Sequence, residues 1–121
     1  MPHVTMEYTA NLPQLDVAKT LLVLNQTLLI SGHFGAEMDI KNRAIPLEFF
    51  QVGTTAASRG FVHVKLALLS GRSAEVKKVL SESLLTALRD SATWPAEVEV
   101  QLSVEVVDLD RESYAKAVIR G

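Results

Sequence analysis

The sequence predicts an α+β fold, in which a duplicated β-α-β unit forms a four-stranded sheet with two helices on one face. Three observations lead to this prediction. Apolar and polar residues alternate near both ends of the chain, and two segments between them carry apolar residues at helical spacing. The strand-helix-strand pattern also occurs twice: the first copy begins at Pro2, and the second begins about 58 residues later, near Gly60. We therefore expect one domain of residues 1–121, with repeats at about 2–58 and 59–109 and a short C-terminal tail.

The first repeat opens with a strand and a helix. Residues 3–8 alternate with period two, which is typical of a half-buried strand. Asn11 is predicted to cap a helix that has Pro13 in its first turn and ends before Gly32. The apolar stripe of this helix consists of Leu15, Ala18, Leu21, Leu22, Leu28 and Leu29.

The next segments are predicted to be two strands joined by a loop. Residues 36–45 suggest a strand, and Pro46 marks either its end or a position at a sheet edge, because proline cannot donate to a strand ladder. A loop rich in small and hydroxyl residues follows at 53–58. Residues 61–69 are nearly all apolar or β-branched, as expected for a strand in the centre of a sheet.

The second repeat continues with a helix and a long strand. Ser73 can cap the helix, which Trp94 and Pro95 would stop. The helix presents an apolar stripe of Val76, Val79, Leu80, Leu84 and Leu88. Residues 98–106 then show the clearest period-two alternation in the chain, which predicts a strand with one wet face.

Right-handed crossovers in both repeats place the two helices on the same face of the sheet. The opposite face then needs another cover, because this chain has no third large helix. We expect that cover to be another subunit. A ferredoxin-like regulatory monomer has the same order of elements and remains an alternative.

Composition narrows the classes of function. The net charge of −2, from 12 Lys and Arg against 14 Asp and Glu, gives no broad attraction for nucleic acid or an anionic membrane. The absence of cysteine excludes disulfides, thiol nucleophiles and Cys-ligated metal sites. No signal peptide or membrane-spanning segment is predicted, so we expect a cytoplasmic protein.

Four short segments, taken together, carry a family resemblance. They are the opening Met-Pro-His (1–3), Ile-Lys-Asn-Arg (40–43), Phe-Val-His-Val (61–64) and Gly-Arg-Ser (71–73). In this order and spacing the chain resembles the 5-carboxymethyl-2-hydroxymuconate isomerase family, a branch of the tautomerase superfamily, whose fold is like that of macrophage migration inhibitory factor. The resemblance runs from Pro2 to about Thr86, is faint through the last predicted strand and is lost in the C-terminal tail.

The resemblance implies a homotrimer of β-α-β-β-α-β subunits with active sites near subunit boundaries. It also implies a cofactor-independent reaction in which an amino-terminal proline moves a proton along an unsaturated 2-hydroxy polycarboxylate. The substrate would be 5-carboxymethyl-2-hydroxymuconate or a close relative, in the bacterial breakdown of homoprotocatechuate-type aromatic compounds.

Pro2 is the predicted catalytic base. Removal of Met1, which is normal before a small residue, would leave Pro2 with a free secondary amine, whereas a retained Met1 would block this nitrogen. An ordinary α-amino group has a pKa of about 8, which must fall by about one unit for half of it to be neutral at pH 7. An apolar pocket and a nearby cation such as Arg72 both lower an amine pKa.

The remaining candidate residues would hold the substrate. Arg72 can bind a carboxylate through two parallel hydrogen bonds, next to the amides of a helix N-terminus. Lys41 and Arg43 lie on the same side of their strand, where they can bind a second carboxylate or stabilise the dienolate. Lys41 stands where the resemblance predicts arginine, so it keeps the charge but lacks the planar fork. His3 and Phe50 are further candidates for the pocket.

Two rival functions follow from the same residues. A phenylpyruvate-type tautomerase would need only a single carboxylate anchor, and a non-catalytic trimeric binding protein would keep the fold without the chemistry. No metal site is expected, because the three histidines have no ligand spacing and no cysteine joins them.

Overall fold

The computed structural model describes residues 1–120 and has the predicted β-α-β-β-α-β order, with one additional short turn of 3₁₀-helix. The predicted domain extends to Gly121, which lies outside the described residues. The elements are β1 (His3–Thr9), α1 (Val17–Ile30), η1 (Glu37–Asp39), β2 (Lys41–Leu47), β3 (Arg59–Leu69), α2 (Ala74–Asp90) and β4 (Glu99–Leu109). The predicted fold class is therefore confirmed.

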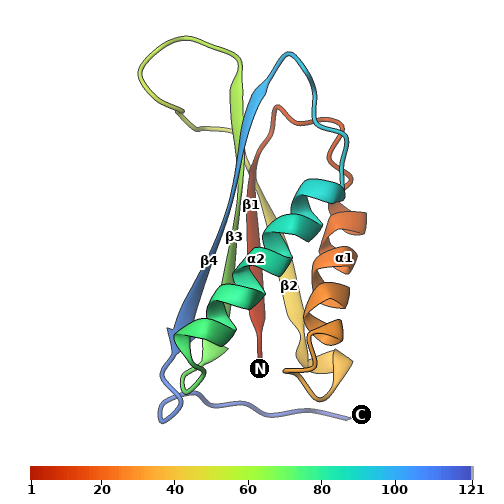
Figure 1. Ribbon diagram of the computed structural model, residues 1–121, viewed down its shortest axis with the longest axis vertical. Helices are drawn as coiled ribbons and strands as arrows, with labels where there is room; N and C mark the ends of the chain where they lie inside the picture. Colours follow the sequence, from red (N-terminus) through yellow and green to blue (C-terminus); the bar gives the residue numbers. More distant parts are fainter. Residues whose placement is uncertain (121) are drawn as a thin grey trace.

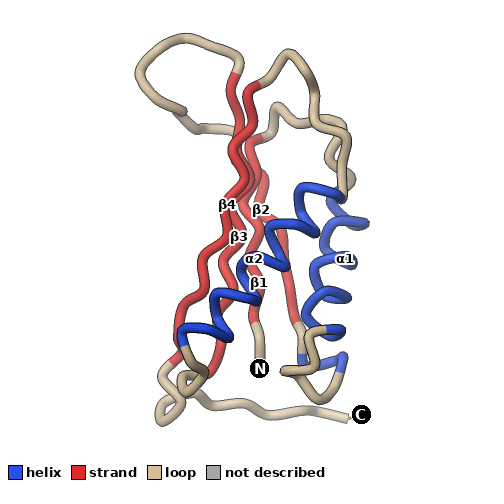
Figure 2. The backbone as a smooth tube through the Cα atoms, in the orientation of Figure 1, coloured by secondary structure: helices blue, strands red, loops and turns tan. Residues whose placement is uncertain are grey.

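The four strands form one mixed sheet in the order β2-β1-β3-β4. β1 runs parallel to β2 and antiparallel to β3, and β3 runs parallel to β4. Both helices lie on the same side of this sheet (Figures 1 and 2). Across the strands, His3 is opposite both Lys41 and Ala67, so the beginning of β1, the beginning of β2 and the end of β3 share one end of the sheet.

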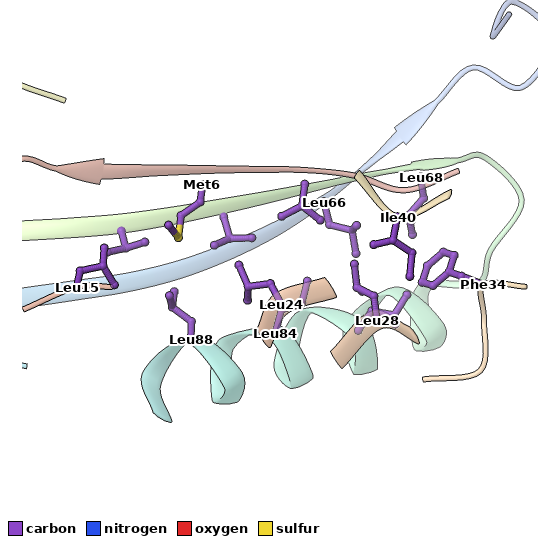
Figure 3. Packing of buried hydrophobic residues seen from close by; sticks show 14 of the residues in the cluster. Met6, Leu15, Leu24, Leu28, Phe34, Ile40, Leu66, Leu68, Leu84 and Leu88 are labelled. Atoms are coloured by element: carbon purple, nitrogen blue, oxygen red, sulfur yellow. The ribbon is translucent and has the colours of Figure 1, made fainter. Parts of the chain in front are cut away.

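The hydrophobic core fills the layer between the sheet and the two helices (Figure 3). Alternate residues of β1 and β3 point into this layer and are fully buried, as period-two alternation requires. They meet the buried leucines of both helices, which recur at helical spacing. The fully buried apolar side chains are Val4, Met6, Leu24, Leu28, Val62, Val64, Leu66, Leu68, Leu80, Leu84 and Leu88.

The predicted start of the first helix is wrong. α1 begins after Asp16, whose carboxylate accepts a hydrogen bond from the backbone N–H of Lys19 at 3.1 Å. Asn11 instead donates its side-chain amide to the carbonyl of Arg59 at 2.9 Å, which ties the end of β1 to the start of β3. Both residues are good helix caps, and the tertiary contact of Asn11 decides between them.

The boundaries predicted for the second strand are also wrong. Residues 37–39 form the 3₁₀ turn η1, and β2 begins only at Lys41. Pro46 lies inside β2 rather than at its end. It is tolerated because β2 is an edge strand, which was one of the two predicted alternatives.

The second repeat follows its prediction closely. β3 lies in the interior of the sheet, between β1 and β4. The Ser73 hydroxyl accepts a hydrogen bond from the N–H of Val76 at 3.2 Å and so caps α2. The helix ends before Trp94, and β4 extends a few residues beyond the predicted 98–106.

No helix within residues 1–120 has the length and apolar character needed to cross a membrane. Within residues 1–120, no helix or strand covers the sheet face opposite the two helices (Figure 1). Its residues are mostly polar, and some of them are already paired. His63 of β3, for example, is hydrogen-bonded to Ser103 and Glu105 of β4.

Candidate active site

The first residues of the chain lie at the end of the sheet where β1 and β2 begin. Pro2 is buried, and its carbonyl accepts a hydrogen bond from the backbone N–H of Lys41 at 3.2 Å. This bond continues the parallel pairing of β1 with β2, in which His3 is opposite Lys41. Strand pairing therefore places Pro2 beside Lys41.

Arg72 reaches the same end from the turn between β3 and α2. Gly71 has a φ of 122°, a left-handed conformation that favours glycine, and it directs the chain from the strand into the helix. The Arg72 guanidinium donates to the carbonyl of His33 at 3.1 Å and lies 5.0 Å above the ring of Phe34. Stacking on a buried ring holds the guanidinium in place while leaving donors for a further partner.

The terminal amine lies within the field of these cations. Its pKa, here that of the Met1 amine, is lowered by burial, then by the charges of Arg72 and Lys41, with a small further effect of Lys116. Asp39 acts in the opposite direction but does not outweigh them. Burial and cationic neighbours both disfavour the ammonium form, so an amine at this place is neutral more often than an ordinary, exposed terminal amine.

His3 connects the site to the C-terminal tail. Its Nδ1 lies 3.2 Å from a guanidinium nitrogen of Arg43, and its Nε2 lies 2.8 Å from the hydroxyl of Tyr114. A guanidinium can only donate, so Nδ1 accepts and the neutral ring carries its hydrogen on Nε2. The neutral form is favoured because burial, and then Lys41 and Arg43, lower the pKa of His3.

Asp39 lies between two lysines. The Lys41 ammonium donates to the backbone carbonyl of Asp39 at 2.6 Å, and the Lys116 ammonium donates to its carboxylate at 2.8 Å. The hydrogen bond from Lys116 holds the pKa of Asp39 below its usual range. Burial, followed by the charge of Lys116, lowers the pKa of Lys41.

Sequence analysis missed Asp39, Tyr114 and Lys116. Asp39 was assigned to a strand, and the tail carries no periodic pattern that would indicate where it lies. Tyr114 is 111 residues from its partner His3, and Lys116 is 77 residues from Asp39. No signal in the local sequence marks contacts over such separations.

Phe50 is the one predicted pocket residue that this chain does not bring to the cluster. Its ring packs edge-to-face on Phe61, with 6.4 Å between ring centroids. Phe61 lies near the end of β1, because Tyr8 pairs with Val62 in the antiparallel register. Phe50 therefore lies at the opposite end of the sheet from Pro2 of the same chain.

The arrangement suits proton transfer on an anionic substrate. The charges of Arg72, Lys41 and Lys116 act on an amine whose pKa is lowered, and Arg43 lies beside the neighbouring His3. Such a site can bind carboxylates and stabilise an enolate oxygen while a neutral amine accepts a proton. Within residues 1–120, no group of three or more His, Asp or Glu side chains is placed to hold a metal ion.

Known proteins resemble this chain in both sequence and fold. A protein-family model described as 5-carboxymethyl-2-hydroxymuconate isomerase matches residues 2–120. Among solved structures, a 5-carboxymethyl-2-hydroxymuconate isomerase from Deinococcus radiodurans R1 is 31% identical, with a TM-score of 0.86, over 96% of this chain and 88% of that chain. A search of curated proteins finds no significant match.

More distant structures share the fold. A 5-carboxymethyl-2-hydroxymuconate delta-isomerase is 17% identical, with a TM-score of 0.71, and covers 100% of this chain and 89% of its own. A fused 4-OT protein, described as a symmetric trimer, is 18% identical, with a TM-score of 0.63, over 95% of this chain and 91% of its own. At these identities the likeness shows the fold alone.

Proposed function

The chain belongs to the 5-carboxymethyl-2-hydroxymuconate isomerase family, and from this premise we propose that it moves a proton along an unsaturated 2-hydroxy polycarboxylate, with the Pro2 amine as general base. The protein is an isomerase of the tautomerase superfamily. The observation that carries the finer proposal is that the buried Pro2 is hydrogen-bonded to the backbone of Lys41 and directly follows an amine on which the charges of Arg72 and Lys41 act. The substrate is 5-carboxymethyl-2-hydroxymuconate or a close relative.

The base is the nitrogen of Pro2 after Met1 has been removed. Inside the Met1–Pro2 peptide bond this nitrogen has no basicity, and cleavage converts it into a secondary amine with a fixed ring. The burial and cations that lower the pKa of the Met1 amine also surround the residue that follows it. These surroundings favour the neutral amine that a base must be.

The reaction needs no oxidant, reductant or cofactor. The Pro2 nitrogen accepts a proton from the substrate and returns it at another atom of the conjugated system, so the product has the same atoms as the substrate. Negative charge develops on the dienolate between these two transfers. Lys41 and Arg43 lie on one side of β2 and supply the positive charge that stabilises it.

Arg72 is the main carboxylate anchor, and the other candidates complete the pocket. Its guanidinium is held by Phe34 and the carbonyl of His33, which prepares it to bind in one orientation. His3 lines the pocket in its neutral form, beside Arg43. Phe50 can take part only if a neighbouring subunit brings it to the site, since its own chain holds it at the far end of the sheet.

The choice of substrate tests this proposal. Arg72, Lys41 and Lys116, the three cations that act on the terminal amine, suit a substrate with several carboxylates, whereas a phenylpyruvate-type enol offers only one. We expect kcat/KM, followed by the change in absorbance, to be higher for 5-carboxymethyl-2-hydroxymuconate than for the enol of phenylpyruvate. Faster turnover of the phenylpyruvate enol would identify the rival tautomerase, and turnover of neither would favour the binding protein.

The working assembly is a homotrimer. No helix or strand among the described residues covers one face of the sheet, and a structure of the same fold is described as a symmetric trimer. A neighbour on this face would be close to the sheet end that holds Pro2. We expect light scattering to give three times the 13.2 kDa mass of the chain, whereas a single-chain mass would support the ferredoxin-like monomer.

The proposed substrate indicates the metabolic process in which the reaction takes part. Isomerisation of this tricarboxylate belongs to the breakdown of homoprotocatechuate-type aromatic compounds, which we place in the bacterial cytoplasm. The small polycarboxylate is the proposed partner of the site, without a role for nucleic acid or membranes.

A further inference from the structure

The C-terminal tail crosses the end of the sheet that holds Pro2. After β4 the chain turns at Asp110, whose carbonyl accepts hydrogen bonds from the N–H groups of Ser113 and Tyr114. It then runs past the N-terminus, below the end of the sheet in Figure 1. The tail is therefore positioned over the candidate site rather than directed away from the molecule.

Three side chains hold the tail in this position. Arg111 donates to the carbonyl of Ser70 at 2.9 Å, in the turn that also carries Arg72. Tyr114 is hydrogen-bonded to His3 at 2.8 Å, and Lys116 is paired with Asp39 at the same distance. Each anchor contacts an element that contributes to the site, so the course of the tail is coupled to the geometry around Pro2.

Lys116 shares a partner with Lys41. The Lys41 ammonium is bonded to the carbonyl of Asp39, and the Lys116 ammonium to its carboxylate. Lys116 also lies 3.5 Å from the sulfur of Met1, which places it beside the residue whose removal would expose the base. Each lysine alone is a point charge, but two ammonium groups around one residue can bind both oxygens of a carboxylate.

When no substrate is bound, Asp39 is the partner of the Lys116 ammonium group. The Asp39 carboxylate forms the same kind of ion pair with Lys116 that a substrate carboxylate would form. Both side chains of this pair are partly exposed. Exchange of one carboxylate for another keeps the Lys116 ammonium group paired throughout. A partly exposed pair is also weak enough to be exchanged.

We infer that Lys116 is a further substrate-binding residue, which releases Asp39 and, together with Lys41, binds a carboxylate of the polycarboxylate substrate. This inference rests on the proposed function and deepens it, because it assigns a second carboxylate subsite to the tail. Arg72 then anchors one carboxylate at the β3–α2 turn, and the two lysines bind another where they now meet Asp39.

Replacing Lys116 by alanine tests the inference. A charge-assisted hydrogen bond contributes enough for its loss to raise KM for 5-carboxymethyl-2-hydroxymuconate about tenfold or more, with little change in kcat. Lys116→Arg restores the charge and should return KM toward the wild-type value. Lys78→Ala is the matched control, since it removes an exposed lysine of α2, and its KM should be unchanged.

Calorimetric titration with tricarballylate, an unreactive tricarboxylate, separates this inference from the proposed function. We expect Lys116→Ala to weaken binding of tricarballylate about tenfold or more and Lys78→Ala to leave it unchanged. Equal affinity of wild type and Lys116→Ala would overturn the role of Lys116 even if the enzyme is active. An inactive wild type that binds tricarballylate through Lys116 would instead overturn only the isomerase.

Discussion

Replacement of Pro2 by alanine is expected to lower kcat/KM for 5-carboxymethyl-2-hydroxymuconate about 100-fold or more, within the range that a general base contributes. After removal of Met1 the variant begins with a primary amine at the same place, so burial and the cations still act on it. It lacks the ring that fixes the direction of the lone pair. Part of the activity should therefore remain, and the measurement is the initial rate of absorbance change.

A form with an uncleaved N-terminal extension tests the free amine independently of the proline ring. The extension keeps Pro2 and all cations but turns its nitrogen into an amide, so we expect no measurable turnover. Mass spectrometry of each preparation establishes whether the chain begins at Met1 or Pro2. An extended form as active as the processed protein would contradict the proposed role of Pro2.

Replacement of Arg72 by alanine is expected to lower kcat/KM about 100-fold, because a charged hydrogen bond to the substrate carboxylate is lost. It should also change the pH dependence. Arg72 lowers the pKa of the terminal amine, so its removal raises that pKa. The protonated amine cannot accept a proton, and the acidic limb of the kcat/KM profile should therefore move to higher pH.

The variant Arg72→Lys distinguishes the effect of the Arg72 charge from that of its planar guanidinium, and Arg89→Ala is the control. Arg72→Lys keeps the positive charge but loses the fork, so KM should rise while the acidic limb stays close to that of the wild type. Arg89→Ala, at the exposed end of α2, should change neither quantity. A wild-type KM together with a wild-type pH profile in Arg72→Ala would contradict the assignment of Arg72 as anchor.

Most of the fold could be predicted from local patterns. β3 is a nearly continuous apolar and β-branched run, α2 and β4 have strong periodicities, and the Ser73 cap lies where the sequence predicts it. The errors occur where two local signals compete. Asn11 and Asp16 are both suitable caps, and the contact between Asn11 and the distant Arg59 decided against the first. Residues 36–39 carried too weak an alternation to separate a strand from a turn.

The candidate site could be predicted in part. Pro2, Lys41, Arg43 and Arg72 were proposed from short segments, and the structure brings these segments to one end of the sheet. Phe50 was proposed from its residue type alone. Its packing against Phe61 places it at the other end of its own chain, which no short segment could reveal.

The sequence by itself determined the order of the elements and the faces they bury, because these follow from spacing along the chain. Through the family resemblance of its short segments it also indicated Pro2 and the cations Lys41, Arg43 and Arg72. Only the tertiary structure showed that Tyr114 and Lys116 also lie at the candidate site. The tail has no helical or strand period beyond β4, so its course depends on hydrogen bonds to Ser70, His3 and Asp39. Contacts over such long separations exist only once the sheet has brought their partners together.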